Sequence, residues 1–358
     1  MMNILNKIRN ISKLRADIPT GLISVVLLAT SASIVSSTVF AQSSSAYNFL
    51  NIPTSSHAFA LGGNGIAVID DDVTLAEQNP ALLGPEIEKQ IAFNYMLYMS
   101  SGNFAGFRYG MAANDRSAWS AGIRYLNYGK MTRYDEFGVS GGEFSPQDIV
   151  FEGTYSHDIT DRWRGGINLK MVYSNYDAYS AFALAADLGV NYYDEEHDLS
   201  LSFVMKNAGG QLKRFHEAYD RLPFDIQIGY MQGLGSTPIS IAVTATNLTR
   251  WRLPYYSHPK NDLSAGSVEK SNFGSNLFRH LIFGVQFTPS SNFYAALAYN
   301  YKTRTDMSAY QQSFLSGFSL GLGLKVKGFN VGAAFGMPHK SATSLMINLG
   351  YSFSELLY

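Results

Sequence analysis

Most of this chain repeats short stretches in which apolar and polar residues alternate. Residues 163–175 show the alternation best. One parity holds the apolar residues Trp163, Ile167, Leu169, Met171 and Tyr173. The other parity holds the polar residues Arg164, Asn168, Lys170 and Ser174. Side chains of a strand point alternately to its two faces, so this pattern predicts β-strands with one apolar and one polar face.

From Gln90 onward the alternation predicts about fourteen strands. Their centres lie near Phe93, Phe107, Ile123, Phe151, Leu169, Ala185, Phe203, Ile228, Val243, Phe283, Ala296, Leu320, Ala333 and Leu349. An even number of antiparallel strands with an apolar outer face is typical of a single-chain outer-membrane barrel.

The predicted connections alternate in length. The short ones are residues 112–116, 158–161, 194–197, 235–237, 288–291 and 327–328, and the longer ones are 129–146, 207–222, 249–276 and 302–312. Outer-membrane barrels have short periplasmic turns and long extracellular loops. A large β-sandwich is the alternative, because its strands alternate as well. The loop asymmetry and the N-terminus favour the barrel.

The first 41 residues resemble a secretory signal peptide. Four basic residues precede an apolar stretch from Leu22 to Val39, and the small residues Val39 and Ala41 suit cleavage before Gln42. The alternative is a transmembrane anchor, since the stretch is long enough to be considered. Six serines and threonines between positions 30 and 38 interrupt it and favour a removed signal.

Residues 42–89 are predicted to form a plug inside the barrel. Residues 90–358 are predicted to form the barrel itself. The segment holds a glycine cluster at 62–65, the acids Asp70 to Asp72 and the sequence Asn79-Pro80-Ala81. It is too polar and irregular to face lipid, whereas irregular backbone is tolerated where protein surrounds it. Residues 73–78 are expected to form a short helix capped by Asp72.

Charged side chains are expected to hold the plug to the wall. Asp70, Asp71 and Asp72 are the plug acids, and Arg124, Arg164 and Lys170 are the inward cations predicted to receive them. Asn79 completes the predicted plug contacts. The alternative is an acidic turn in solvent, whose ion pairs would contribute little.

Composition narrows the possible functions. The net charge of −1 argues against nucleic-acid binding, and the absence of cysteine excludes disulfides, thiol catalysis and cysteine metal sites. The seven histidines are scattered without metal-ligand spacing. Residues 138–141 lack the spacing of a nucleophile elbow, and Ser275 with His280 is only a weak hydrolase pair. We therefore expect no enzyme, catalytic residue, metal or cofactor.

Several motifs, in order, resemble the PorV/PorQ family of the type IX secretion system, which is related to FadL-type channels. In the plug they are residues 60–64, 69–72 and 78–83; in the barrel they are 122–130, 135–138, 222–227 and 247–251. The resemblance implies a FadL-like barrel of about fourteen strands in the outer membrane. It also implies a non-enzymatic anchor for a PorZ-like surface protein. A PorU-like sortase, a PorV-like barrel and lipopolysaccharide would belong to the same attachment complex.

Two long loops are the predicted docking surfaces, because aromatics and arginines are enriched at protein interfaces. The residues are Arg133, Tyr134, Phe137, Arg250, Trp251, Arg252, Tyr255 and Tyr256. The alternative is that the aromatics form the outer girdle and the arginines meet lipopolysaccharide phosphates.

A FadL-like channel for a hydrophobic solute is the second functional hypothesis. In it, the plug would bind the solute and a wall opening would release it, with Gly102 and Gly106 leaving room in the second strand. A general porin fits less well, because the plug would block its lumen.

Overall fold

A computed structural model describes residues 47–99, 101–135, 137–217, 219–253, 255–257, 267–269, 272–306, 314–339 and 342–353. The backbone alone is described for residues 255–257, 267–269, 338–339 and 342. The predicted signal peptide, residues 42–46 of the predicted plug and the tail from Ser354 to Tyr358 lie outside these residues.

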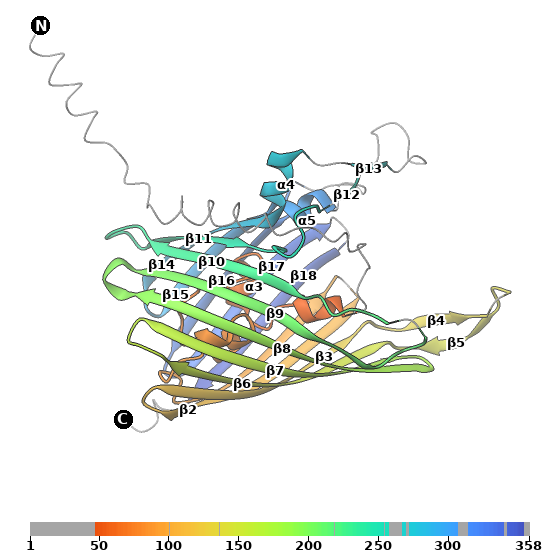
Figure 1. Ribbon diagram of the computed structural model, residues 1–358, viewed down its shortest axis with the longest axis horizontal. Coiled ribbons are helices and arrows are strands. Elements are labelled where there is room, and N and C mark those ends of the chain that lie inside the picture. The colour runs from red at the N-terminus through yellow and green to blue at the C-terminus, as the bar shows by residue number, and fades with distance from the viewer. Residues whose placement is uncertain are drawn as a thin grey trace, which may run out of the picture. The chain divides into compact units, whose positions relative to one another are not determined.

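Fourteen antiparallel strands form a closed barrel, which confirms the predicted strand number and fold class (Figure 1). Each predicted centre lies within one of them. The strands are β1 (Lys89–Tyr98), β2 (Gly102–Asn114), β3 (Ser117–Asn127), β6 (Gln147–Asp158), β7 (Trp163–Tyr176), β8 (Tyr179–Asp194), β9 (Leu199–Lys213), β10 (Asp225–Gly233), β11 (Ile239–Ala245), β14 (Leu281–Ser290), β15 (Phe293–Asn300), β16 (Phe318–Val326), β17 (Phe329–His339) and β18 (Ala342–Ser352).

The strands keep the predicted parity. On β7, Leu169 and Met171 are exposed, whereas Asn168 and Lys170 are buried. An apolar residue that is exposed on the outer wall has no protein partner there, as a lipid-facing side chain requires. The polar parity therefore faces the lumen.

The barrel closes between its first and last strands. β1 pairs with β18 in an antiparallel register that joins Gln90 to Ser352, and the amide of Phe353 donates to the carbonyl of Lys89 at 2.9 Å. Both ends of the barrel chain thus lie at one rim. We call it the turn rim, because the connections there are residues 115–116, 159–162, 195–198, 234–238, 291–292 and 327–328.

The opposite end is the loop rim, with connections 99–101, 128–146, 177–178, 214–224, 246–280, 301–317 and 340–341. Four of them are long, as predicted, and three have two or three residues. The long ones carry the hairpin β4 (Met131–Tyr134) and β5 (Ser140–Phe144), the pair β12 (Tyr255–Ser257) and β13 (Ser267–Glu269), and the helices α4 (Phe273–His280) and α5 (Tyr301–Asp306).

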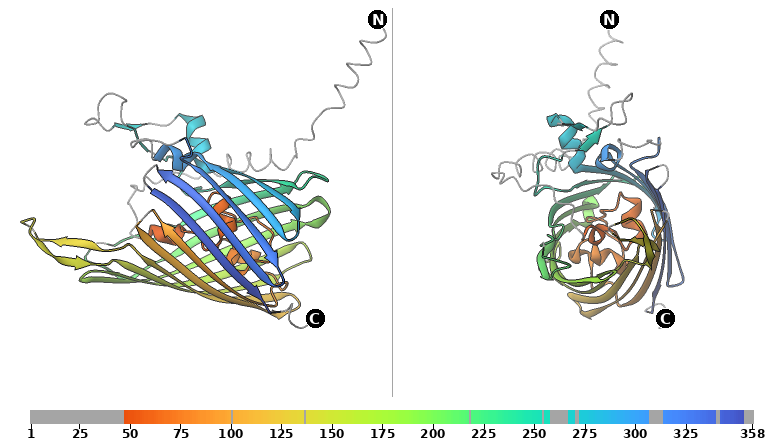
Figure 2. Two further views of the ribbon diagram at one scale, coloured as in Figure 1. Left: turned by 180° about the vertical axis from the view of Figure 1, so that it is seen from behind. Right: turned by 90° about the vertical axis from the view of Figure 1, so that its right-hand side faces the viewer.

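Residues 47–88 lie inside the barrel (Figure 2, right). The helices of this described segment are all short: η2 (Asn48–Asn51), α3 (Ser56–Ala60), η3 (Val73–Glu77) and η4 (Pro80–Leu82). The predicted helix at 73–78 is present as η3, a 3₁₀ helix in which the Asp72 side chain accepts from the Thr74 amide. A further 3₁₀ turn, η5 (Glu195–His197), joins β8 to β9 at the turn rim.

Among the described residues, no helix is long and apolar enough to cross a membrane.

Candidate functional site

The plug runs through the lumen from the loop rim to the turn rim. Tyr47, its first described residue, is fully buried. Its hydroxyl lies 2.9 Å from Nε2 of Gln211 near the loop end of β9, and its ring lies 6.2 Å from that of Phe215 in the following loop. The plug ends at Lys89, where β1 starts at the turn rim.

Glycines of the wall make room for the plug backbone. A Cβ on Gly189 of β8 would lie 2.0 Å from Oδ1 of Asn79, and one on Gly166 of β7 would lie 2.5 Å from the Pro80 carbonyl. On the other side of the barrel, a Cβ on Gly332 would lie 2.2 Å from Oγ of Ser56. The close approach of plug and wall therefore depends on positions without a side chain.

Asn79 fixes the turn between η3 and η4. Its Oδ1 accepts from the Ala81 amide at 2.9 Å, while its Nδ2 donates to the Ile66 carbonyl at 2.9 Å and to Oγ of Ser202 at 3.0 Å. One buried amide thus caps η4, joins two parts of the plug and contacts β9.

Glu77 carries the charge at the plug centre. Its Oε1 lies 3.5 Å from Nη1 of Arg124 on β3 and 3.6 Å from Nζ of Lys206 on β9. Burial alone would raise the pKa of Glu77, but the charges of Lys206 and Arg124 outweigh it and lower the pKa. A single plug carboxylate therefore connects two separate parts of the wall.

Wall residues extend this network. Glu152 on β6 forms ion pairs with Arg108 on β2 and with Arg124 on β3. Arg108 also donates to Oγ of Ser120 at 3.0 Å and to Oγ1 of Thr154 at 3.1 Å. Buried charges need such partners, because an unpaired charge in a low-dielectric interior is costly.

The acidic run does not meet the three cations predicted for it. Arg124 pairs with Glu77. Arg164 pairs with Glu86 of the plug, with 2.9 Å between Nη2 and Oε1, and with Asp158 of the wall. Lys170 pairs with Asp187 of β8 at 2.6 Å. The prediction was wrong in its pairing, because parity gives the direction of a side chain but not its height in the lumen.

Asp70 instead forms an ion pair with Lys325 of β16. Its Oδ2 also lies 3.0 Å from Nδ1 of His57 on α3. Burial alone would raise the pKa of Asp70, but His57 and Lys325 outweigh it and hold the pKa well below its usual range. Together with the ion pairs of Glu77 and Glu86, this contact is a third charged link between plug and wall among the described residues.

The other two acids stay within or beside the plug. Asp72 caps η3, and burial raises its pKa. The carbonyl of Asp71 accepts from Nε2 of Gln90 at 2.9 Å.

His57 connects α3 to the strands β14 and β15 of the wall. Its Nε2 lies 2.7 Å from Oε1 of Gln286 on β14, and its ring stacks on Tyr294 of β15 with 3.7 Å between centroids. Sequence reasoning missed Glu77, His57 and Lys325. The inward parity of Lys325, between the outward Leu324 and Val326, was a signal that could have found it.

Two cavities between plug and wall measure about 10 Å³ each. Such a volume holds one water molecule at most. The wall register is regular at Gly102 and Gly106, where β2 pairs with β1 and β3 without a shift. The predicted opening near these glycines is therefore absent from this structure.

The predicted docking residues fall into two groups on the loop rim. Arg133, Tyr134 and Phe137 belong to the β4–β5 hairpin, which extends beyond the barrel strands (Figure 1). Phe137 at its tip is 87% exposed. Arg133 forms an ion pair with Asp177 in the β7–β8 turn and connects the hairpin to the rim.

Arg250, Trp251 and Arg252 form the second group, between β11 and β14. Both arginines are exposed, and Trp251 is half-buried. The side chains of Tyr255 and Tyr256 lie outside the described residues. In strand order, six strands separate the two groups one way round the barrel and eight the other way, so the structure does not bring them together.

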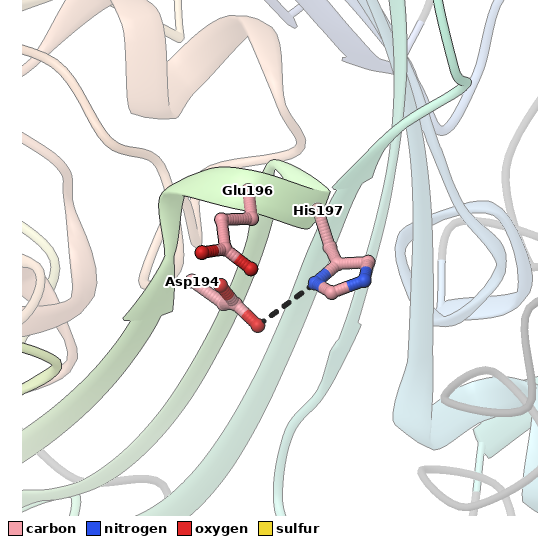
Figure 3. A group of neighbouring side chains, drawn as sticks. All are labelled: Asp194, Glu196 and His197. Atoms are coloured by element: carbon pink, nitrogen blue, oxygen red, sulfur yellow. Dashed lines mark hydrogen bonds and ion pairs between the residues drawn. The ribbon is translucent and has the colours of Figure 1, made fainter.

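One group of described residues places three potential metal-binding side chains together at the turn rim: Asp194, Glu196 and His197 (Figure 3). Oδ2 of Asp194 lies 3.0 Å from Nδ1 of His197. Arg162 lies 3.5 Å from Asp194 and 4.0 Å from Glu196. The chain therefore supplies cationic and hydrogen-bonding partners to these acids itself.

His280 has both ring nitrogens at backbone carbonyls, 2.8 Å from Thr246 and 3.0 Å from Trp251. It is thus held as a structural residue, and the predicted weak pair with Ser275 gains no support from this geometry.

No family model and no curated protein matches the sequence. Solved structures do match. A mutant TodX monoaromatic hydrocarbon channel aligns with a TM-score of 0.52 at 10% identity, over 84% of this chain and 99% of that one. The Pseudomonas putida toluene transporter TodX aligns with a TM-score of 0.49 at 10% identity, over 84% of this chain and 96% of that one. A Pseudomonas aeruginosa FadL homologue aligns with a TM-score of 0.48 at 11% identity, over 84% of this chain and 98% of that one.

The chain thus has a FadL-like outer-membrane barrel fold. At these identities the likeness defines the fold alone. The neighbours are channels and porins, which are not enzymes.

Proposed function

We propose that this protein is a plugged, non-enzymatic outer-membrane barrel whose loop rim faces the cell surface and docks a surface protein. By its motifs, the partner would be a PorZ-like protein of a type IX secretion complex. A PorU-like sortase and a PorV-like barrel would be further members. The observation that carries the proposal is the contrast between a plug held in the lumen by ion pairs to the wall and a rim that projects an exposed hairpin.

The hairpin suits docking for physical reasons. β4 and β5 pair only with each other, and a lone two-stranded hairpin is marginally stable in water. Its tip nevertheless exposes Tyr134, Phe137 and Val139. Large aromatic residues of this kind supply much of the binding energy at protein interfaces.

The test is affinity purification of the tagged protein from its own outer membranes in mild detergent, followed by mass spectrometry. We expect a large surface protein in near-stoichiometric amount. Tyr134→Ser with Phe137→Ser should reduce its recovery at least tenfold, as the loss of a hot spot of about 2 kcal/mol implies. Phe314→Ser is the matched control, because Phe314 is also highly exposed but lies in another loop.

A deletion of residues 249–276 is a poorer test. It would remove the start of α4 (Phe273–His280) and the Asn276 contacts that hold it. Recovery of the barrel alone, with or without the hairpin substitutions, would contradict the docking function.

A channel for a hydrophobic solute is the second candidate, and the structural comparisons support it somewhat better than the docking function. One neighbour with a TM-score above 0.5 is described as a monoaromatic hydrocarbon channel. Liposomes that contain the purified protein would be tested for entry of radiolabelled toluene. The channel would be favoured if toluene entered these liposomes faster than protein-free liposomes and if affinity purification recovered no partner protein.

A further inference from the structure

We propose that the loop rim between β11 and β14 binds a phosphorylated glycolipid of the outer leaflet. Helix α4 would lie among the acyl chains, and Arg250 and Arg252 would bind the phosphates. The inference rests on the proposed orientation of the loop rim toward the cell surface, but not on the identity of a protein partner.

Helix α4 has its polar side against the barrel. Asn276, Arg279 and His280 are buried. Arg279 pairs with Asp306 of α5 at 2.6 Å, and Oδ1 of Asn276 accepts from the Leu253 amide at 3.1 Å. The helix is thus fastened to the rim by its hydrogen-bonding residues.

The other side of α4 is apolar and exposed. Phe273 is 65% exposed and Phe278 is 51% exposed. In water, an amphipathic helix of a folded protein normally buries its apolar side. A helix with the opposite arrangement is suited to lie at a membrane surface with its apolar side in lipid.

This apolar side continues the lipid-facing wall. The ring of Phe278 lies 6.1 Å from that of Phe283 on β14. Phe283 shares the outward parity of Val285 and Phe287, which are both exposed on the same strand. Since α4 leads directly into β14, its position relative to the lipid-facing surface is fixed by the wall. The occupant that fits this continuous surface is therefore lipid.

Two arginines supply the charge that a lipid of this class would need. Arg250 and Arg252 flank Trp251, whose ring lies 5.4 Å from that of Phe273 on α4. Both arginines are exposed, and no carboxylate of the described residues forms an ion pair with either. Arginine binds phosphate through two parallel hydrogen bonds. The combination of an apolar helix and exposed arginines without an ion pair among the described residues favours an anionic amphiphile.

Hydrogen bonds from the barrel hold the arginine segment in place. The Trp251 carbonyl accepts from Nδ2 of Asn276 and lies 3.0 Å from Nε2 of His280. The Trp251 ring also stacks on His280, with 5.2 Å between centroids. Trp251 would thereby keep its neighbouring arginines close to the lipid boundary.

The experiment uses the full-length protein in phosphatidylcholine nanodiscs with added diphosphoryl lipid A. Bound lipid A per barrel is counted by native mass spectrometry at low salt. We expect Arg250→Ala with Arg252→Ala to weaken binding by about tenfold or more for each arginine, as loss of a charge-assisted hydrogen bond implies. Phe273→Ser with Phe278→Ser should weaken binding as well.

Three controls make the result specific. Arg116→Ala with Arg162→Ala removes the same charge at the turn rim and should leave binding unchanged. Arg250→Lys with Arg252→Lys keeps the charge and should retain part of the binding. Heat-modified gel mobility reports whether each variant still forms the barrel.

The proposal would be overturned if the arginine double variant bound lipid A as tightly as the wild-type protein. It would also be overturned if the wild-type protein bound dephosphorylated lipid A as tightly as diphosphoryl lipid A. Competition by millimolar inorganic phosphate alone, without a contribution from the phenylalanines, would mean a phosphate site and not a lipid site. If the arginine or phenylalanine double variant no longer recovered the surface protein but still bound lipid A, this part of the rim would be a protein interface. That result would also contradict the proposal.

Discussion

At the scale of single residues, Asp70 gives the clearest test of the plug contacts. Asp70→Asn removes the charge that pairs with Lys325. We expect a loss of about 1–3 kcal/mol of stability at pH 7, because Lys325 keeps its charge without a partner. The measurement is chemical unfolding in detergent, followed by tryptophan fluorescence.

The pH dependence of this effect has a definite sign. The pKa of Asp70 is lower in the folded protein than its usual value of about 3.9. Its contribution is therefore fully present above about pH 4 and disappears as the pH falls toward the folded pKa. The difference between wild type and Asp70→Asn should shrink on acidification below pH 4. If the stability difference between wild type and Asp70→Asn stayed constant down to pH 2, this ion pair would not be the source of the difference.

Gly189 tests the steric fit of the plug. Gly189→Ala would place a Cβ 2.0 Å from Oδ1 of Asn79, so that the turn at Asn79 must move. We expect a loss of about 1–3 kcal/mol, typical of overpacking. Gly153→Ala is the matched control, because Gly153 is a strand glycine with open space at its Cβ position. If both variants lost the same stability, the effect would come from replacing any strand glycine and not from contact with the plug.

At the scale of elements, the β4–β5 hairpin is independent of the barrel sheet. The ion pair between Arg133 and Asp177 connects it to the β7–β8 turn, and we expect this contact to restrict its motion. Arg133→Ala should therefore increase hydrogen exchange of residues 131–144 and leave exchange of β3 and β6 unchanged. A rise in β3 or β6 as well would mean that the hairpin supports the wall.

The barrel strands and the rim helix α4 differed in how well the sequence predicted them. Each barrel strand was predictable, because an outer face in lipid and an inner face on polar groups impose a local two-residue period. Helix α4 was not, since its loop was predicted as a whole. It buries Asn276, Arg279 and His280, and no local rule places polar residues on the buried side of a rim helix.

At the scale of the whole molecule, a conductance measurement tests whether the plug closes the barrel. Its interior link at Glu77 connects β3 and β9. We expect no single-channel conductance from the wild-type protein in planar bilayers. Glu77→Ala leaves Arg124 and Lys206 without this partner, a change that costs about 3–5 kcal/mol in buried pairs, and should produce intermittent openings. Steady wild-type conductance would contradict a closed lumen.

The sequence by itself determined the number of strands, the face that each strand turns outward and the presence of a polar plug segment. These properties depend on neighbours within a few residues. The tertiary structure alone decided which charges meet: Glu77 with Arg124 and Lys206, and Asp70 with Lys325. Those contacts join residues 47 to 255 positions apart, and they exist only because barrel closure and strand register fix the height and angle of each inward side chain.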